Sequence, residues 1–411
     1  MSNELSTGAD VPACDALNPY PWFRWMRRNA PVYQDPTTQL WYVFGYHNVL
    51  RILNPPLKPT KEDPILFTSR VMESTERHWA QDSVVFTDPP RQRAVRGVLN
   101  PSFSPKVVQD HYTIPITSTI TTLLDQIINE GQMDVVTHLT YALTLPTISE
   151  VMGIPQEDRE VFEHWTTQSL GLEGESQDYY ARVPEMERYF LHALEKRRHQ
   201  ENKHALDPIS RLVYTCPEDG IPLTPEEQLG NCEALPIVGT ESTANLITNL
   251  FRVLDAFPHV QQQVWANPSL VPALIEETLR YFSPLHLIPY RTLRQVELEG
   301  KVIPENQIIL GLLSSANRDE ELFADPDSFN LMRFATTPPN HVAFGFRGAH
   351  FCLGAPLARM ETTLLMQQVI ERMQHIRLVP GTSLKPLHIP MGVLPMYNGV
   401  QSFPVTFERR S

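Results

Sequence analysis

The sequence contains few cysteines, and no two of them have the spacing of a known cysteine motif. The four cysteines stand at positions 14, 216, 232 and 352. They form no CxxC pair, no zinc-ligand spacing and no CxxCH signature of covalently attached haem. We therefore expect neither a disulfide framework nor a structural zinc site.

Long hydrophobic runs are missing as well. No stretch reaches the roughly 18 consecutive apolar residues that a membrane-spanning helix requires. The first residues, MSNELSTGADVPACDALNPYPWF, contain no apolar segment of the signal-peptide type. We therefore expect a cytoplasmic protein without a membrane anchor.

Gly/Ser linkers, repeats and low-complexity tracts are also absent, so nothing divides the 411 residues into separate domains. A hydrophobic content of 42% is sufficient for a large core. The 37 prolines are spread along the chain, which is typical of many helices joined by ordered turns. We predict a single domain that spans residues 1–411 and acts as a monomer.

Positive charge is scarce. The chain has 34 lysines and arginines against 47 aspartates and glutamates, and its formal net charge is −13. Because binding to phosphates requires a basic face, no nucleic acid is expected as a partner.

One cysteine, Cys352, has surroundings that favour a thiolate. Gly345, Gly348 and Gly354 lie around it and allow the backbone to turn so that several N–H groups converge. A helical pattern begins near Pro356, and the positive N-terminal end of a helix favours an anion. Such a thiolate suits a reactive nucleophile or the axial ligand of a haem iron. The alternative is a free cysteine buried as a small apolar side chain.

The segment FGFRGAHFCLG, residues 344–354, resembles the haem-ligand loop of the cytochromes P450, whose pattern is F-G-x-G-x-H-x-C-x-G. The second glycine, the histidine, the cysteine and the last glycine match position for position. The Phe-Gly pair stands one residue further upstream than the family spacing. Either the loop is longer by one residue, or Phe346 replaces the usual aromatic.

The resemblance implies a non-covalent haem b with Cys352 as the axial ligand of its iron. It also places four other residues of this loop against the cofactor. They are Gly345, Phe346, His350 and Gly354.

A short helical pattern follows the DPP turn at residues 88–90. Asp88 is predicted to cap this helix, and Gln92 and Arg96, four residues apart, share one of its faces. The resemblance assigns Gln92 and Arg96 to a haem propionate, although some family members have histidine where Gln92 stands. It assigns Arg291, at the end of SPLHLIPYR, to a propionate as well. The alternative for the DPP helix is an exposed amphipathic helix.

Residues 224–257 predict one long helix that is disturbed in its middle. Thr224 and the glutamates after it form a capping pattern. Pro236 lacks an N–H group and predicts a kink. Gly239 leaves room on one face.

GTEST, residues 239–243, places an acid beside hydroxyl groups within this apolar helix. Cleavage of dioxygen requires protons that arrive without flooding the pocket with water. Glu241 can relay protons from solvent, and Ser242 can hydrogen-bond the oxygen or a nearby water. The family has threonine in place of Ser242, so Thr243 is a second candidate for this role. The alternative is a capping-type polar pair in a kinked helix.

Glu277 and Arg280 are one helical turn apart and predict an ion pair. Most such pairs are surface contacts that contribute little. In the resembled family the pair is buried and joined by a further arginine, here Arg333. The resemblance therefore implies a structural role for these three residues.

Five arginines near the motifs can form a local basic patch despite the negative net charge. They are Arg91, Arg93, Arg96, Arg347 and Arg359. Such a patch suits an acidic electron-transfer protein. A solvated helix face accounts for any one of them equally well.

Apolar residues near the motifs predict a hydrophobic substrate cavity. They are Val238, Leu285, Leu287, Ile288 and Leu394, with Val393 and Met396 close by. His286 fits an exposed loop better than a group that binds a polar part of the substrate. Residues 389–399 predict a C-terminal hairpin that reaches the pocket. The resemblance places residues 60–86 over the substrate and makes residues 165–185 a lid.

The signatures together imply the cytochrome P450 fold, which is mainly α with small β-sheets and forms a triangular helical prism around a central long kinked helix. One of those sheets is predicted to contain a hairpin formed by Val32–Tyr33 and Leu40–Phe44. The resemblance implies a monooxygenase that inserts one oxygen atom of O2 into a hydrophobic small molecule. Its electrons come from NAD(P)H through a reductase and a ferredoxin-type partner. The alternatives are a peroxide-driven hydroxylase and a non-catalytic haem-thiolate sensor or ligand-binding protein.

Overall fold

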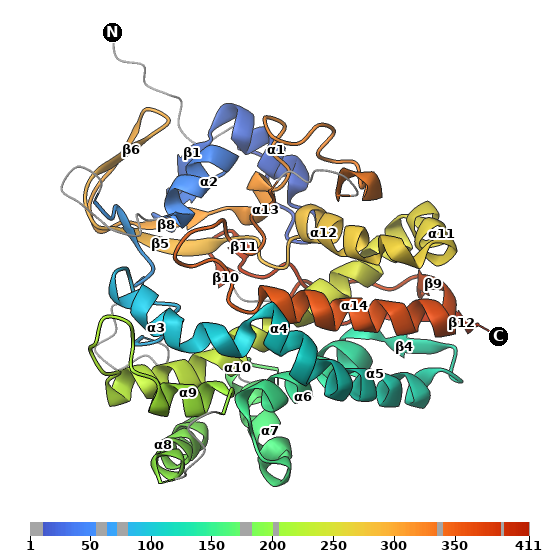
Figure 1. The fold of residues 1–411 in the computed structure, drawn as a ribbon. Coiled ribbons are helices and arrows are strands. Elements are labelled where there is room, and N and C mark those ends of the chain that lie inside the picture. Colours follow the sequence, from blue (N-terminus) through green and yellow to red (C-terminus); the bar gives the residue numbers. More distant parts are fainter. Residues whose placement is uncertain are drawn as a thin grey trace.

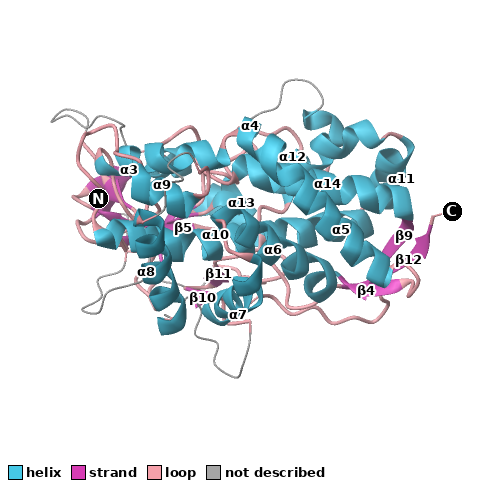
Figure 2. Ribbon diagram, turned by 60° about the horizontal axis from the view of Figure 1, so that its bottom comes forward, coloured by secondary structure: helices cyan, strands magenta, loops and turns pink. Residues whose placement is uncertain are grey.

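The structure, a computed structural model, describes residues 11–54, 64–71, 81–172, 183–199, 205–334, 340–387 and 390–410. Helices dominate and the sheets are small (Figure 2), which confirms the predicted mainly α fold. The α-helices are α1 (Tyr20–Asn29), α2 (Tyr46–Leu53), α3 (Arg91–Leu99), α4 (Pro105–Val107), α5 (Thr113–Ile127), α6 (Tyr141–Met152), α7 (Arg159–Ser169), α8 (Pro184–Arg198), α9 (Pro208–Tyr214), α10 (Pro225–Ala256), α11 (Pro258–Ala266), α12 (Val271–Tyr281), α13 (Leu313–Ala316) and α14 (Ala355–Arg372). The strands are β1 (Val32–Gln34), β2 (Trp41–Val43), β3 (Phe67–Thr68), β4 (Gln132–Asp134), β5 (Ile288–Thr292), β6 (Val296–Leu298), β7 (Lys301–Ile303), β8 (Ile308–Gly311), β9 (Met373–Leu378), β10 (Pro390–Met391), β11 (Leu394–Pro395) and β12 (Pro404–Arg409).

The long helix α10 begins where the sequence predicts. The Thr224 hydroxyl accepts a hydrogen bond from the Glu227 N–H, and the Glu227 carboxylate accepts one from the Thr224 N–H, at 3.2 and 2.9 Å. This reciprocal pair satisfies two N–H groups at the helix start. Helices α6, α8 and α12 pack against α10, which passes through the helical part of the molecule (Figure 1). Most of its residues are therefore buried.

Helix α14 begins just after Cys352 and packs against α5 and α12. Its buried face includes Leu357, Leu365 and Val369, at the spacing that the sequence predicts for one side of a helix. This packing holds the N-terminal end of α14 in place beside the cysteine loop.

The two larger sheets lie at opposite sides of the view in Figure 1. One has five strands in the order β1-β2-β8-β5-β3, and the other has three in the order β4-β12-β9. The predicted hairpin of β1 and β2 is confirmed, with Val32 opposite Val43. Strand β2 is parallel to β8, and β5 is antiparallel to it.

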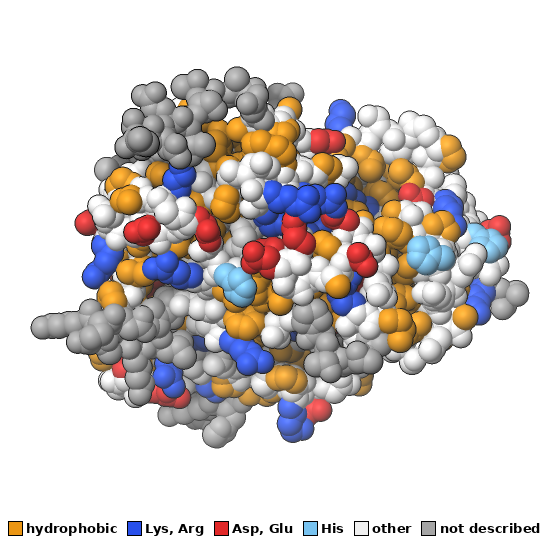
Figure 3. Space-filling view, turned by 90° about the horizontal axis from the view of Figure 1, so that it is seen from above, with side chains coloured by type: hydrophobic (Ala, Val, Ile, Leu, Met, Phe, Trp, Pro, Cys, Tyr) orange, Lys and Arg blue, Asp and Glu red, His pale blue; other side chains and the backbone are white. Residues whose placement is uncertain are grey.

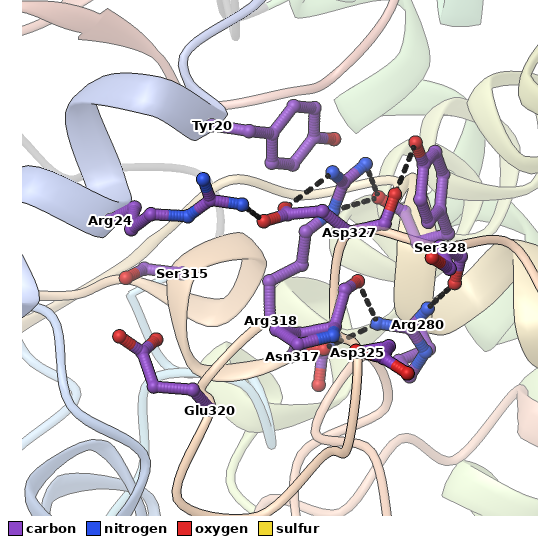
Figure 4. A network of polar contacts seen from close by, with 12 residues as sticks. Tyr20, Arg24, Arg280, Ser315, Asn317, Arg318, Glu320, Asp325, Asp327 and Ser328 are labelled. Atoms are coloured by element: carbon purple, nitrogen blue, oxygen red, sulfur yellow. Dashed lines mark hydrogen bonds and ion pairs between the residues drawn. The ribbon is translucent and has the colours of Figure 1, made fainter.

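A partly buried polar network joins helix α1 to the loop after α13 (Figure 4). The Arg318 guanidinium lies 3.4 and 3.5 Å from the ring centroids of Tyr20 and Tyr281. Its Nη1 donates to Asp327 at 3.2 Å, and Asp327 also pairs with Arg24 of α1. The network therefore fastens the N-terminal helix to the segment that leads toward the cysteine loop.

Two segments predicted to cover the substrate fall partly outside the described residues. Of residues 60–86, the structure describes 64–71 and 81–86, and the lid at 165–185 is described up to residue 172 and from residue 183. The covering loop and the lid remain predictions. None of the helices in the described ranges combines the length and apolar character that crossing a membrane requires.

Candidate active site

The loop that carries Cys352 is a tight turn joined directly to α14. Cys352 donates its N–H to the Phe344 carbonyl at 2.8 Å. Gly345 has φ +76°, a left-handed conformation that favours glycine. The N–H groups of Gly354 and Ala355 hydrogen-bond the Cys352 sulfur. The convergence of N–H groups that the sequence predicts is therefore present.

Opposing effects act on the pKa of the Cys352 thiol. Burial raises this pKa and is the largest effect, whereas the N–H of Gly354, the charges of Arg96 and Arg359 and the N–H of Ala355 lower it. The pKa is raised overall. A positive partner at the sulfur, such as a metal ion, is what converts a thiol of this kind into a thiolate.

Gly348 allows the loop to pack closely on the end of α2. A Cβ atom at this position would lie 2.5 Å from Asn54 Oδ1 and 2.8 Å from the Leu53 carbonyl oxygen. Real side chains do not tolerate such distances to backbone, so the position requires glycine. The loop is thereby held at a fixed distance from α2.

The Cys352 sulfur faces a cavity of about 350 Å³ with mainly apolar walls. Helix α10 lines the same cavity with Val238, Gly239, Ser242 and Thr243. These two segments are far apart in the chain, and the packing of the helices brings them together. The sulfur and the hydroxyl groups singled out by the sequence therefore share one space.

Gln92, Arg96 and His350 supply polar groups to this cavity. Gln92 Nε2 and Arg96 Nη1 donate to the Ala349 carbonyl at 2.7 and 3.3 Å. Among the described residues, Gln92 Oε1 and His350 Nε2 are buried atoms without a hydrogen-bond partner. Buried polar atoms are rarely left in this state unless a ligand satisfies them.

These features fit haem. The apolar walls suit a porphyrin, the sulfur suits its iron, and Arg96 and Gln92 suit its carboxylates. Burial lowers the pKa of His350 to about 4, so its ring is neutral and acts through hydrogen bonds. Gly345 and Gly354 also line the cavity, as the resemblance implies. The contacts of these residues with the cofactor remain predictions.

Glu241 is buried but does not line the cavity. The hydroxyl of Tyr141, on α6, hydrogen-bonds its two carboxylate oxygens at 3.1 and 3.0 Å. Asn245 Nδ2 donates to one of them at 3.0 Å. Burial raises the pKa of Glu241 to about 7, although both of these bonds lower it. A carboxyl with this pKa exchanges protons near neutral pH, which suits a proton donor.

Ser242 and Thr243 both line the cavity. Ser242 Oγ donates to the Val238 carbonyl at 3.2 Å, whereas Thr243 Oγ1 forms no hydrogen bond within the described part of the chain. Both oxygens can bond a molecule in the cavity. The choice between the two alcohols, left open by the sequence, stays open.

The predicted contacts of Glu277 are all present. Arg280 Nε and Nη2 donate to its two oxygens at 2.8 and 2.7 Å, and Arg333 Nε donates at 3.3 Å. Arg280 also donates to the carbonyls of Asn317 and Ser328 (Figure 4). These bonds tie α12 to the loop that precedes the cysteine loop.

Leu287 does not line the cavity, which corrects its prediction. The residues of β5 that line the cavity are Ile288, Pro289 and Tyr290. Leu287, just before the strand, packs in the core. Arg291 is not among the lining residues either, but its Nε is a buried polar atom. Its guanidinium donates to Asn306 and to a backbone carbonyl, and its assignment to a propionate remains a prediction.

Two further predictions, for Leu394 and Phe346, are wrong because other side chains of the same segments line the cavity. In the hairpin of β10 and β11, Met391 and Met396 line it, whereas Leu394 packs in the core. In the cysteine loop, Phe344 lines the cavity, and Phe346 instead lies 5.7 Å from the guanidinium carbon of Arg347. The C-terminal hairpin itself is confirmed.

His286 and Asp88 also differ from expectation. His286 is fully buried rather than exposed, and its Nδ1 hydrogen-bonds the Ser314 hydroxyl at 3.0 Å. Asp88 does not cap α3, because its carboxylate accepts bonds from the Thr68 hydroxyl and the Ser69 N–H. Val393, named near the pocket, is 43% exposed.

The predicted arginine patch is not formed as a unit. Arg91 binds Glu227 and Asp219, and Arg96 faces the cavity. Arg359 binds Glu276. The two remaining arginines of the set, at positions 93 and 347, are exposed. In Figure 3, positive and negative side chains lie interleaved on the coloured part of the face.

Sequence reasoning did not name several residues that line the cavity. Val84, Val85 and Phe86 belong to the segment that the resemblance places over the substrate, and Leu235 lies on α10. Three consecutive apolar residues within a polar loop were the available signal for the first group. Tyr141, the partner of Glu241, had no signal because its contact is made across 100 residues of sequence.

Comparisons with known proteins agree with this geometry. The family model described as Cytochrome P450 matches residues 240–398. The chain is 31% identical over 380 residues to the putative cytochrome P450 YjiB of Bacillus subtilis, with 90% of this chain and 91% of that protein covered. It is 30% identical over 401 residues to the cytochrome P450 monooxygenase PikC of Streptomyces venezuelae, with 96% and 92% covered.

The fold is also similar to that of CYP109E1 from Bacillus megaterium. The substrate-free structure has a TM-score of 0.83 and 30% identity, and the alignment covers 95% of this chain and 99% of that one. The complex of CYP109E1 with testosterone gives a TM-score of 0.79 and 32% identity, with 95% and 98% covered. On the evidence of these similarities in sequence and fold, this chain belongs to the cytochrome P450 family and is an enzyme of the cytochrome P450 type.

Proposed function

We propose that this enzyme inserts one oxygen atom of O2 into a hydrophobic small molecule, using electrons from NAD(P)H that arrive through a reductase and a ferredoxin. The observation that carries the proposal is the shared cavity, which Cys352, Ser242 and Thr243 all line. A sulfur ligand for iron and alcohols for proton transfer therefore face one mainly apolar space.

Haem b bound at Cys352 supplies the oxygen chemistry, because a thiolate ligand pushes electron density toward the iron and favours O–O cleavage. The chain supplies the cradle. The N–H groups of Gly354 and Ala355 stabilise negative charge on the sulfur. Gln92 and Arg96 bind the carboxylates at the edge of the macrocycle.

Protons reach the cavity through side chains of α10. The Thr243 hydroxyl can donate into the cavity, and the Ser242 hydroxyl does so once it leaves the Val238 carbonyl. Glu241 holds a proton near neutral pH, since its pKa is raised to about 7 by burial. Its carboxyl lies outside the cavity and turns toward Ser242 to hand the proton over.

The walls of the cavity favour an apolar substrate. Val84, Val85, Phe86 and Leu235 present hydrocarbon or aromatic surface, and such surface binds molecules mainly by removing them from water. The related CYP109E1 is known in complex with testosterone. We therefore expect a steroid, a terpenoid or a molecule of similar size and apolar character.

The test begins with haem-loaded enzyme and a panel of steroids and terpenoids that includes testosterone. Compounds that change the haem absorption spectrum are then incubated with NADPH, reductase, ferredoxin and isotopically labelled O2. We expect labelled product that depends on each of these components. Product formed with hydrogen peroxide alone would replace the proposal by a peroxide-driven reaction, and tight binding without any product would indicate a sensor or binding protein.

A further inference from the structure

The carboxyl of Glu241 is held by two side chains that come from different helices. Tyr141 of α6 contacts both of its oxygens at 3.1 and 3.0 Å, and Asn245, one turn along α10, contacts one of them at 3.0 Å. Ser242 lines the cavity, whereas Glu241 and its two partners do not. Proton transfer into the cavity therefore requires the carboxyl to leave this position.

Asn245 cannot follow Glu241 if the carboxyl moves. Its Nδ2 also donates to the Glu241 backbone carbonyl at 2.9 Å. A Cβ atom at Gly399 would lie 1.8 Å from Asn245 Oδ1, so the C-terminal segment packs directly against this amide. These contacts hold the Asn245 side chain in one position.

Tyr141 is held in place by the close packing of α6 on α10. A Cβ atom at Gly239 would lie 2.8 Å from Ile148 Cδ1, which shows how near the two helices approach. The Tyr141 ring is partly buried against the main hydrophobic core. Its hydroxyl is therefore directed at Glu241 by the fold and is not simply a mobile surface group.

The strength of this contact depends on the charge of Glu241. A hydrogen bond to a carboxylate is roughly twice as strong as one to a neutral carboxyl. Tyr141 therefore holds the ionised form firmly and the protonated form loosely. The proton-loaded side chain is the form that is released.

We propose that Tyr141 is a positioning residue for proton delivery: its hydroxyl retains ionised Glu241 on the α6 side of α10 and releases it toward Ser242 once it is protonated. The proton passes from the Glu241 carboxyl to the Ser242 hydroxyl oxygen, whose own proton moves into the cavity. The carboxylate then returns to Tyr141 and is reprotonated from solvent. This inference rests on the proposed function for the destination of the proton.

The surroundings of Glu241 make this contact measurable. Tyr141 is the titratable group that contacts it from α6, and no charged side chain in the described ranges contributes to the pKa of Glu241. Glu361 of α14 is another acid near α6, where the Thr147 hydroxyl bonds it, and Glu163 of α7 accepts a bond from the Ser149 hydroxyl of α6 at 3.4 Å. Glu241 and Glu361 thus have different hydroxyl donors on the same helix.

The first measurement is an infrared titration of protonated carboxyl bands in the haem-loaded enzyme. Glu241→Gln identifies the Glu241 band. Tyr141→Phe keeps the ring and removes a donor that lowers the pKa of Glu241, so its band is expected to titrate at higher pH. Thr147→Val is the matched control and is expected to move only the Glu361 band. Tyr189→Phe, which removes a hydroxyl bond to Asp158, is expected to move neither.

The second measurement is the pH dependence of coupled product formation. In Tyr141→Phe, the alkaline limb is expected to shift to higher pH by the same amount as the infrared pKa, with substrate affinity unchanged. An infrared pKa that does not respond to Tyr141→Phe overturns the inference. A shifted pKa with an unshifted alkaline limb also overturns it, because Tyr141 then affects Glu241 without affecting delivery. Wild-type enzyme that forms no labelled product at any pH overturns the proposed function as well, and this result is distinct from the other two.

Discussion

The carboxylate of Glu277 and the guanidinium of Arg280 form a two-point ion pair from which solvent is excluded on both sides. Removal of one partner leaves a buried charge without its counterion, which costs about 3–5 kcal/mol. We expect Glu277→Gln to lower the free energy of unfolding by this order and to reduce haem retention. Chemical denaturation followed by circular dichroism measures the first effect, and haem absorbance measures the second.

The matched control is a pair with the same spacing at the surface. Glu185 and Arg188 on α8 are bonded at 2.7 Å, with side chains that are 52% and 68% exposed. Glu185→Gln is expected to change the free energy of unfolding by less than about 1 kcal/mol. Equal effects of the two substitutions would show that burial does not set the contribution of the Glu277 pair.

Cys352 is expected to determine the haem spectrum. In Cys352→His, a neutral imidazole replaces the sulfur that faces the cavity. We expect loss of the long-wavelength band of the reduced carbon monoxide complex, from which the family takes its name. Cys216→Ser, at an exposed cysteine, is expected to retain the band. If the band persists in Cys352→His, Cys352 is not the ligand.

Ser242 is expected to couple electron use to product formation, because its hydroxyl lies on the cavity wall next to Glu241. Ser242→Ala should reduce coupled product formation by about 10²-fold, at the lower end for an acid–base group, and should raise peroxide release. Ser242→Thr keeps the hydroxyl and should retain coupling. Product and peroxide are measured per NADPH consumed.

Two variants separate Ser242 from its neighbours. Thr240→Val removes a hydroxyl that donates to the Pro236 carbonyl at 2.7 Å and does not line the cavity, and coupling should be unchanged. Thr243→Val tests the second alcohol on the wall. A loss of coupling in Thr243→Val, with none in Ser242→Ala, would transfer the role to Thr243.

Glu361 makes stability depend on pH. It is 2% exposed, and burial raises its pKa from the ordinary 4.5 of a glutamate to about 8. Between these values the folded protein retains a proton that the unfolded chain has lost. Stability is therefore highest below this window and falls as pH rises through it, by about 1.4 kcal/mol per pH unit.

Glu361→Gln is expected to remove this part of the decline, which denaturation at a series of pH values measures. Glu241 contributes a similar decline up to about pH 7, so the curve of the variant should flatten most between pH 7 and 8. Glu371→Gln, on the exposed face of α14, should give a curve parallel to that of the wild type. A Glu361→Gln curve parallel to the wild type would contradict the raised pKa.

The parts of the site that can be predicted from the sequence are those formed within one element. The Thr224 capping box, the turn before Cys352 and the Glu277–Arg280 pair each depend on residues that are only a few positions apart. Their geometry follows from the helix repeat and from the conformations open to glycine. The structure therefore contains all three as expected.

The directions of side chains depend on the packing of segments that are distant in the sequence. The sequence determines that Glu241 and Ser242 are adjacent on α10, but the packing of α6 places the first against Tyr141 and leaves the second at the cavity. The same holds for His286, which is buried although its segment resembles a loop. Local spacing sets which residues share a face, whereas burial, partners and pKa depend on surfaces contributed by distant segments, and only the tertiary structure brings those surfaces together.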